Sequence, residues 1–161
     1  MRFIPYNTND AEKVLKMLAR HFDYTPELTS ADNSLSNIDY FREVYGETGY
    51  SGICYVLLED DESVSGMLEA TQYNGNKGDV CWYITSLFVR VNEEMDTKAR
   101  YMVDSFCKSL HDINDICANV HPSDEKAARF WINNGFSPNP ERSMFSNSEN
   151  QRLVAYWKRI T

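Results

Sequence analysis

Hydrophobic and polar residues recur along the chain with two different spacings, and each change of spacing marks a new element. Residues 2–7 alternate between apolar and polar side chains, which predicts a short strand. Residues 9–22 carry apolar side chains at helical spacing, which predicts a helix capped by Thr8 or Asn9. The apolar positions of this helix are Ala11, Val14, Leu15, Leu18 and Phe22.

The next part of the chain predicts a loop, a second helix and a hairpin. Residues 24–37 are polar and rich in turn-forming residues, so we expect a long loop that either closes over a ligand or is mobile. A helix is expected around residues 38–46. Two apolar runs, residues 53–60 and 63–73, are joined by an acidic turn and predict a β-hairpin.

The second half of the chain alternates between strands and helices. The succession of strand, helix and strand from Asp79 to His121 is a βαβ unit, which predicts a parallel strand pair with a right-handed crossover. Its helix has one apolar face that includes Met102 and Phe106. A helix over residues 123–135 and strands near residues 141–145 and 151–160 complete the predicted α/β protein with a mixed sheet.

Composition limits the class of protein. The chain has 161 residues, 42% of them hydrophobic, and shows no second composition regime, so we expect a single domain over residues 1–161. No apolar run approaches the roughly 18 residues of a membrane span, and the first residues lack the apolar region of a signal peptide. We therefore expect a soluble, cytoplasmic protein with no membrane partner. Four widely spaced cysteines indicate reduced thiols and no metal site: Cys54, Cys81, Cys107 and Cys117.

The charge of the chain indicates the class of its partners. The formal net charge is -8, with 16 basic and 24 acidic residues. Binding to nucleic acid relies on clustered Lys and Arg, so a nucleic-acid partner is not expected. An acidic surface favours cationic ligands.

Three stretches of the chain resemble one known family. These are "RFIPYNTNDAEKVLKML", "EDDESVSGML" with Gly66, and "AARFWINNGF" with Gly135 and Phe136. Together with the order of the elements, they resemble the GNAT family of acyl-CoA-dependent N-acetyltransferases over essentially the whole chain. The resemblance implies the single-domain GNAT acyltransferase fold, with about seven strands and flanking helices. Gly135 also has a structural explanation, because glycine commonly follows a helix end in the left-handed conformation.

The resemblance implies acetyl-CoA as the cosubstrate. In the family the fourth and fifth strands splay apart, and the backbone of the fourth strand holds the pantetheine arm. The pyrophosphate lies on the N-terminus of the following helix, where free N–H groups and the helix dipole favour an anion. The family's Q/R-x-x-G-x-G/A loop falls on residues 94–99, where only Ala99 fits. The implied cofactor-binding residues are Leu87, Phe88, Val89, Glu94, Met95, Asp96, Thr97, Lys98, Ala99, Arg100, Asp124, Ala127 and Trp131.

The first turn of this helix is acidic, with Glu93, Glu94 and Asp96, and two interpretations stay open. Acidic residues there stabilise the helix dipole by ~0.3–1 kcal/mol each. Against a pyrophosphate the same carboxylates repel, by about 1 kcal/mol per charge pair at 4 Å in water and about 4 kcal/mol at an effective dielectric constant of 20. Lys98, Arg100 and the Thr97 hydroxyl would offset this repulsion, and we expect weakened cofactor binding.

The family's usual general acid, a tyrosine on the helix after the fifth strand, falls on Trp131. An indole N–H donates a hydrogen bond but does not deliver a proton at neutral pH. Trp131 therefore indicates a non-catalytic or differently catalytic protein, or it is a pocket wall or core residue.

Four other residues are candidates for the catalytic proton transfers. Tyr83 falls where some family members carry a glutamate base, Glu69 is a candidate base acting through water, and His121 and Ser123 are substitute groups at the end of the fifth strand. Each has a structural alternative: strand packing for Tyr83, a solvated carboxylate for Glu69, a strand-end histidine for His121 and a helix N-cap for Ser123.

The resemblance implies an N-acetyltransferase that moves an acetyl group from acetyl-CoA to a primary amine of a small molecule or protein. The alternative is a catalytically inactive GNAT-fold protein that binds acyl-CoA or a protein partner. A third alternative, an interaction protein without a cofactor, predicts that Glu93, Glu94 and Asp96 project into the groove. Homodimers are common in the family, and residues 151–160 are candidates for an edge strand in such a dimer.

Overall fold

The fold is described from a computed structural model of the chain. The structure describes residues 1–10, 12–14, 16–17, 52–74, 80–90, 92–111, 115–140 and 152–160. The predicted loop at 24–37, the helix at 38–46 and the strand near 141–145 lie outside these residues. No helix in the described part of the chain has the length and apolar character needed to cross a membrane.

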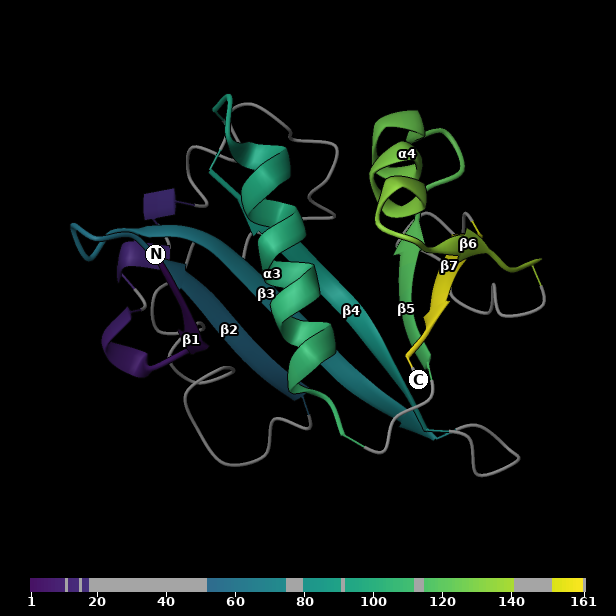
Figure 1. Cartoon of the computed structure of the whole chain (residues 1–161), viewed down its shortest axis with the longest axis horizontal. Coiled ribbons are helices and arrows are strands. Elements are labelled where there is room, and N and C mark those ends of the chain that lie inside the picture. Colours follow the sequence, from purple (N-terminus) through teal and green to yellow (C-terminus); the bar gives the residue numbers. More distant parts are fainter. Residues whose placement is uncertain are drawn as a thin grey trace. The chain divides into compact units, whose positions relative to one another are not determined.

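The described residues form a mixed sheet of seven strands in the order β1-β2-β3-β4-β5-β7-β6 (Figure 1). This confirms the predicted α/β fold with a mixed sheet. The strands are β1 (Arg2–Pro5), β2 (Gly52–Leu58), β3 (Val64–Asn74), β4 (Val80–Val89), β5 (Asp115–Val120), β6 (Ser137–Pro138) and β7 (Val154–Arg159). The helices are the 3-10 turn η1 (Thr8–Asp10), α3 (Met95–Ser109) and α4 (Glu125–Asn133).

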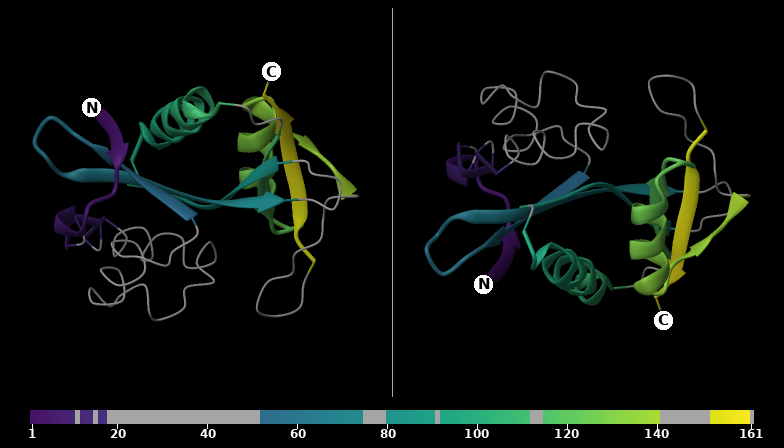
Figure 2. Two further views of the ribbon diagram at one scale, coloured as in Figure 1. Left: turned by 90° about the horizontal axis from the view of Figure 1, so that it is seen from below. Right: turned by 90° about the horizontal axis from the view of Figure 1, so that it is seen from above.

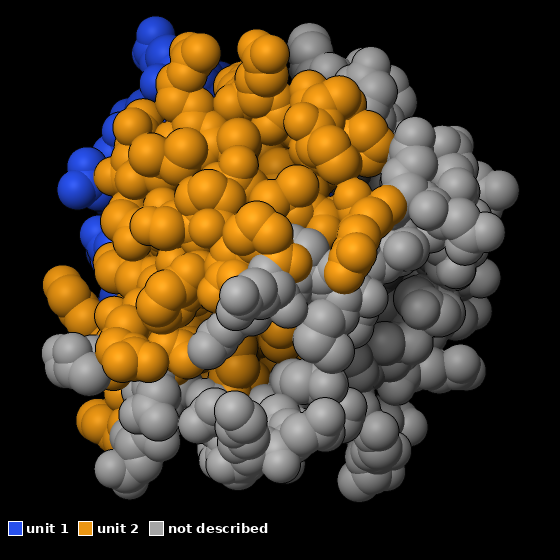
Figure 3. All heavy atoms as spheres, turned by 90° about the vertical axis from the view of Figure 1, so that its right-hand side faces the viewer, with its two compact units in different colours: residues 1–69, 86–105 blue, residues 70–85, 106–161 orange. Residues whose placement is uncertain are grey.

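The contacts divide the chain into two compact units, which Figure 3 shows in two colours. The first unit comprises residues 1–69 and 86–105, and the second comprises residues 70–85 and 106–161. Each unit is described by itself.

In the first unit, β1 pairs antiparallel with β2, and α3 lies against β3 (Figure 1). Gly66 makes this close approach possible, because a Cβ there would lie 2.7 Å from Cε of Met102 and 3.2 Å from the carbonyl oxygen of Phe88. The hydrophobic core of this unit is built from side chains of several elements. It contains Val14, Met17, Val56, Leu58, Val64, Met67 and Phe88.

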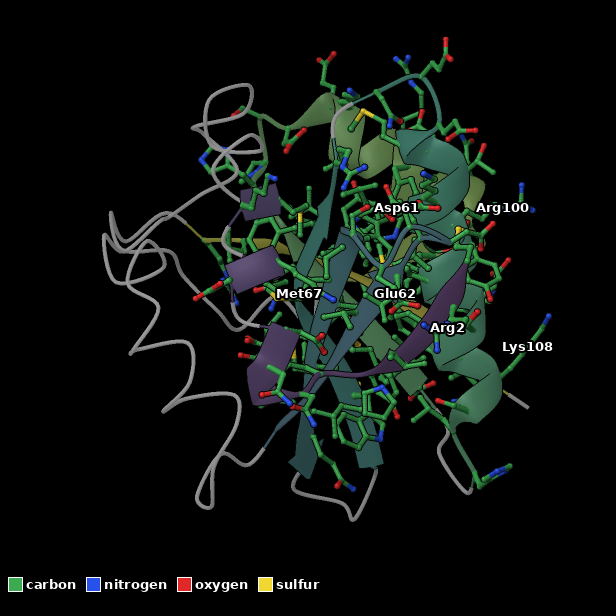
Figure 4. The ribbon with its side chains drawn as sticks, turned by 90° about the vertical axis from the view of Figure 1, so that its left-hand side faces the viewer. Arg2, Asp61, Glu62, Met67, Arg100 and Lys108 are labelled. Carbon is green, nitrogen blue, oxygen red and sulfur yellow. The ribbon has the colours of Figure 1, made fainter. Side chains whose placement is uncertain are left out.

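The acidic turn of the predicted hairpin joins β2 to β3. Asp61 Oδ1 accepts hydrogen bonds from the N–H and hydroxyl of Ser63, at 2.9 and 2.6 Å. Glu62 adopts a left-handed φ of 65° and pairs with Arg2 at 2.7 Å, and Figure 4 shows these two side chains together near the turn. The prediction of a hairpin with an acidic turn is confirmed.

In the second unit, β4 and β5 pair in parallel from Cys81↔Asp115 to Ile84↔Ala118, which confirms the predicted βαβ unit. Strand β7 pairs antiparallel with β5 and with β6. Helix α4 lies beside β7 in both views of Figure 2.

The predicted capping residues of the first helix, Thr8 and Asn9, lie in the 3-10 turn at Thr8–Asp10, where Oδ1 of Asn7 accepts from the N–H of Asn9 at 2.9 Å. Residue 11 lies outside the described residues, so the cap of this helix stays a prediction. Two other local predictions were wrong. Helix α4 is capped by Asp124, and Ser123 is not the N-cap. Strand β7 lies between β5 and β6 in the sheet, so it is not the terminal strand that a dimer through residues 151–160 would use.

Candidate functional site

The N-terminus of α3 presents the backbone N–H groups of Asp96 and Thr97, which find no acceptor in the described part of the chain. Asn92 closes the preceding turn, because its Oδ1 accepts from the N–H of Glu94 at 2.9 Å and its carbonyl accepts from Met95 at 3.3 Å. The first helical hydrogen bond runs from the N–H of Lys98 to the carbonyl of Glu94, at 3.0 Å. The N–H groups of Asp96 and Thr97 therefore have no acceptor among the described residues. Free N–H groups at the positive end of a helix are suited to bind an anion.

Two of the three acidic side chains at this N-terminus, Glu93 and Asp96, are exposed with no ion pair to another described residue. The third, Glu94, is also exposed, but its Oε2 lies 3.2 Å from Nζ of Lys98. The same Nζ lies 2.5 Å from Oε1 of Glu59, at the end of β2. The side chain of Lys98 is only 11% exposed, and its ammonium group is paired with these two carboxylates.

The pKa values of this ion pair support full ionisation at neutral pH. Hydrogen bonds from Lys98, and then from Ser65, lower the pKa of Glu59 below its usual value. Burial acts to lower the pKa of Lys98, but the hydrogen bonds to Glu59 and Glu94 outweigh it and leave that pKa raised. The ion pair therefore fixes the first turn of α3 to the end of β2.

The two neighbouring arginines are directed elsewhere. Arg90 donates from its guanidinium to the hydroxyl of Ser63 at 3.2 Å and to the carbonyl of Val64 at 2.9 Å. Arg100 is exposed and lies 3.9 Å from Asp104 (i,i+4). Figure 4 shows Arg100 and Lys108 pointing outward from α3. In the described part of this unit, the anion-binding capacity of the α3 N-terminus thus rests on backbone N–H groups and on the exposed Thr97.

The predicted residues at the end of β4 are partly or fully buried. Phe88 and Val89 are 7% and 5% exposed, while Leu87 is half-buried. Ala99 is also buried, and Met95 is half-buried at the start of α3. At this strand end the backbone and the half-buried side chain of Leu87 are suited to contact a ligand, whereas the side chains of Phe88 and Val89 are buried.

Glu69, a predicted base on β3, is half-buried near Cys54 of β2. Burial and the negative charge of Glu69 raise the pKa of the Cys54 thiol far above its usual value. The structure places the carboxylate of Glu69 close enough to this thiol for its charge to act on it.

His121 and Ser123 form a hydrogen-bonded pair at the end of β5, in the second unit. The backbone N–H of Ser123 donates to Nδ1 of His121 at 3.1 Å, and the Ser123 Oγ lies 2.6 Å from the same nitrogen. Because a backbone N–H can only donate, Nδ1 is the acceptor, and the proton of the neutral ring is on Nε2. The Ser123 hydroxyl therefore donates its hydrogen bond to Nδ1 of the imidazole.

Asp124 is the N-cap of α4. Its Oδ1 accepts from the N–H of Ala127 at 2.9 Å. Serine and aspartate are both preferred N-caps, so the sequence did not distinguish Ser123 from its neighbour. The cap leaves the Ser123 hydroxyl available for His121.

Trp131 occupies a structural position at the C-terminal end of α4. The N–H of Phe136 donates to the carbonyl of Trp131, and the N–H of Gly135 donates to that of Ile132, each at 3.0 Å. With Gly135 at φ +86°, this is a Schellman motif. The motif favours an apolar contact between the residues that Trp131 and Phe136 occupy, and their ring centroids lie 4.8 Å apart.

Two polar residues with a structural role were not predicted from the sequence: Glu59 in the first unit and Asn119 in the second. Glu59 was missed because its partner, Lys98, is 39 residues away. Asn119, on β5, has a buried Oδ1 with no hydrogen-bond partner among the described residues. Its only signal in the sequence is a polar residue within the apolar strand "DICANV". Tyr83 is buried opposite Cys117 on the same strand pair.

No family sequence profile matches the chain, and no curated protein sequence matches it. Solved structures do match. Aminoglycoside 6'-acetyltransferase type Ii has a TM-score of 0.71 and 15% identity, over 100% of this chain and 98% of that one. A GNAT-family acetyltransferase from Staphylococcus aureus Mu50 has a TM-score of 0.72 and 13% identity, over 99% of each chain. Ribosomal-protein-S5-alanine acetyltransferase from Vibrio fischeri has a TM-score of 0.72 and 11% identity, over 98% and 92%.

Proposed function

We propose that this chain, whose fold is that of the GNAT acetyltransferases, transfers an acetyl group from acetyl-CoA to a primary amine. The observation that carries the proposal is the pair of unsatisfied N–H groups at the α3 N-terminus, Asp96 and Thr97. By the resemblance to the family, these N–H groups correspond to the position that binds the pyrophosphate. Backbone groups of Leu87, Phe88 and Val89 would hold the pantetheine arm.

In this proposal, the acidic first turn of α3 reduces the affinity for acetyl-CoA without abolishing it. The ion pair with Lys98 partly neutralises Glu94, which lowers its repulsion of a pyrophosphate. Glu93 and Asp96 are exposed, where water screens their charges. We therefore propose that acetyl-CoA binds with moderate affinity.

In the transfer itself, a neutral amine attacks the thioester carbonyl, an N–C bond forms, and the C–S bond breaks to release the CoA thiolate. The amine must lose a proton, and the thiolate must gain one. We assign this proton path to Ser123 and His121, since they already share a hydrogen bond of 2.6 Å. The Ser123 hydroxyl accepts the amine proton and passes its own to Nδ1, and the imidazolium then protonates the thiolate or releases the proton to water.

The acceptor in this proposal is a cationic amine, either small or on a protein. The net charge of -8 favours such an acceptor over an anionic one. Aminoglycoside 6'-acetyltransferase and ribosomal-protein-S5-alanine acetyltransferase, which share the fold, illustrate the two kinds of acceptor in their names. The buried Oδ1 of Asn119 is an unused acceptor that would bind an N–H group of the ligand.

The remaining expectations belong to the same proposal. The protein works in the cytoplasm as a single domain over residues 1–161. It also forms a homodimer, through a surface other than the outer edge of β7 where β6 pairs.

The second candidate is a GNAT-fold protein that binds acyl-CoA or a protein partner without catalysis. The observation that favours it is Trp131, because the family's acidic hydroxyl is replaced there by a side chain that completes a helix end. The competing third candidate, without cofactor, is disfavoured by the ion pair that turns Glu94 toward Lys98.

A turnover assay distinguishes the first two candidates. Purified protein is mixed with acetyl-CoA and a panel of amines: polyamines, amino sugars and peptides with a free N-terminus. Release of the CoA thiol is followed with a thiol reagent. We expect release that depends on the amine, while binding of acetyl-CoA with no release for any amine would favour the non-catalytic candidate.

A further inference from the structure

Two buried cysteines from neighbouring strands are in direct contact in the second unit. The Sγ atoms of Cys81 and Cys117 lie 3.2 Å apart. The two residues are 6% and 0% exposed, and neither forms a disulfide. They pack with Tyr83 and Trp157 in one small core cluster.

The sheet fixes this contact. Cys117 on β5 lies opposite Tyr83 on β4, and Cys81 lies two residues earlier on β4, opposite Asp115. Residues two apart on a strand share a face, so both thiols project from the same side of the sheet. A disulfide has an S–S distance of about 2.0 Å, so the sulfur atoms need to approach by only about 1 Å.

We propose that Cys81 and Cys117 are a reversible modification site, at which a peroxide oxidises the two thiols to a disulfide. The ionised sulfur of Cys81, the more accessible of the two, attacks one peroxide oxygen and becomes a sulfenic acid, and water leaves. The sulfur of Cys117 then attacks the Cys81 sulfur, forms the S–S bond and displaces a second water. With hydrogen peroxide the two thiols lose two electrons and two protons, and the peroxide is reduced to two molecules of water.

The contact itself favours this chemistry at Cys81 over an isolated buried thiol. Either sulfur can donate across this contact, and once Cys81 is ionised the S–H of Cys117 is the donor and stabilises the thiolate. The second sulfur is already in place, so a sulfenic acid is trapped as a disulfide before it is oxidised further.

The other two cysteines provide matched controls. Cys54 belongs to the first unit, and burial together with Glu69 raises its pKa and keeps it protonated. Cys107 lies on α3 and is half-buried. The short contact between two sulfur atoms is the one between Cys81 and Cys117.

The disulfide would cross-link β4 to β5 and close a loop that contains α3. Closing a loop of this length restricts the unfolded chain, so the oxidised protein is expected to unfold at a temperature about 5–15 °C higher. The inference does not depend on the proposed acetyl transfer, and its test uses no substrate.

Peptide mapping provides the test. The full-length protein is treated with hydrogen peroxide, its remaining thiols are alkylated under denaturing conditions, and it is digested with trypsin without reductant. Cleavage after Lys and Arg places each cysteine in its own peptide: 43–77, 78–90, 101–108 and 109–126. We expect peptide 78–90 to be linked to peptide 109–126, and a dithiol reductant to reverse the link and the rise in melting temperature.

Variants make the result specific. Cys107→Ala and Cys54→Ala are expected to retain the link, and Cys81→Ala to lose it together with the rise in melting temperature. If Cys81→Ala fails to fold, mapping of the wild-type protein still decides the question. The proposal is overturned if Cys81 and Cys117 remain alkylatable while the other cysteines are oxidised, if either is linked to Cys54 or Cys107, or if the link joins two molecules.

Discussion

At the residue scale, the end of α4 explains an unusual tryptophan. Trp131 is 6% exposed and packs against both Phe130 and Phe136, at centroid distances of 5.1 and 4.8 Å. Its carbonyl accepts the hydrogen bond that ends the helix, and Gly135 makes the turn possible. A large apolar side chain is favoured here by the helix end itself, so a structural role explains Trp131 without any role in catalysis.

The same motif gives a stability prediction. Gly135→Ala places a Cβ on a backbone with φ +86°, which costs about 1–2 kcal/mol for a residue other than glycine. The nearest atom, Cε of Lys158, lies 3.5 Å away, so steric conflict adds little. Urea unfolding should show this loss, with Asn133→Ala on the last turn of α4 as the control. An unchanged midpoint for Gly135→Ala would show that the helix does not end in this way.

A second residue-scale prediction separates catalysis from capping at the start of α4. Ser123→Ala should lower kcat by about tenfold or more, because it removes the proposed relay to His121. Its stability should be unchanged, since the hydroxyl is exposed and does not cap the helix. Asp124→Ala should instead lose about 1 kcal/mol of unfolding free energy. Steady-state kinetics and urea unfolding of both variants test this, and a wild-type kcat for Ser123→Ala would remove the relay.

At the element scale, α3 is attached to the sheet by packing and by one ion pair. Gly66 admits Met102 close to β3, and Lys98 joins the first turn to Glu59 at the end of β2. This arrangement was partly predictable. The apolar face of the helix was visible in its spacing, but Glu59 and Lys98 are 39 residues apart and no local pattern connects them.

The ion pair predicts a pH-dependent stability. The pKa of Glu59 is lowered in the folded protein, so its stabilising effect is present above the usual value of 4.5 and is lost as the pH falls through the lower folded value. Glu59→Gln should cost about 1–2 kcal/mol at pH 7, and the difference from wild type should disappear as both proteins are acidified below pH 4.5. Urea unfolding of both proteins across this pH range measures the difference in their unfolding free energies.

The exposed pair of Arg2 and Glu62 supplies the control, since these side chains are 58% and 60% exposed. Glu62→Gln should change stability by less than about 0.5 kcal/mol at every pH. Equal losses for Glu59→Gln and Glu62→Gln would contradict the structural role of the Lys98 ion pair.

The acidic first turn of α3 gives a binding prediction. Glu94→Gln removes one negative charge near the proposed pyrophosphate position. In these water-exposed surroundings, the Kd of acetyl-CoA should fall by about two- to fivefold. Asp104→Asn, farther along the same helix, should leave the affinity unchanged. Calorimetry measures both, and equal affinities for Glu94→Gln and wild type would place the carboxylate away from the ligand.

At the scale of the whole molecule, the order of the strands and helices was readable from the sequence, and the detailed chemistry was not. Changes in the spacing of hydrophobic residues predicted the parallel pair of β4 and β5, and Gly135 marked the end of α4. Adjacent residues with equal capping preference concealed the role of Asp124. The position of β7 inside the sheet, and the buried acceptor of Asn119, arise from contacts between distant segments.

The fold alone does not fix the activity, because a shared fold supports several functions and the three structures named above are only 11–15% identical to the chain. The account depends on whether the altered loop binds the cosubstrate. Its residues depart from the family pattern, yet the free N–H groups of Asp96 and Thr97 keep the physical basis for binding an anion.

Calorimetric titration of the protein with acetyl-CoA tests this claim most directly. We expect one site per chain with a Kd in the micromolar range, about -8 kcal/mol, and weaker binding of CoA derivatives that lack the pyrophosphate. Absence of binding at millimolar acetyl-CoA would contradict the account, and would mean that the fold is retained for a purpose other than acetyl transfer.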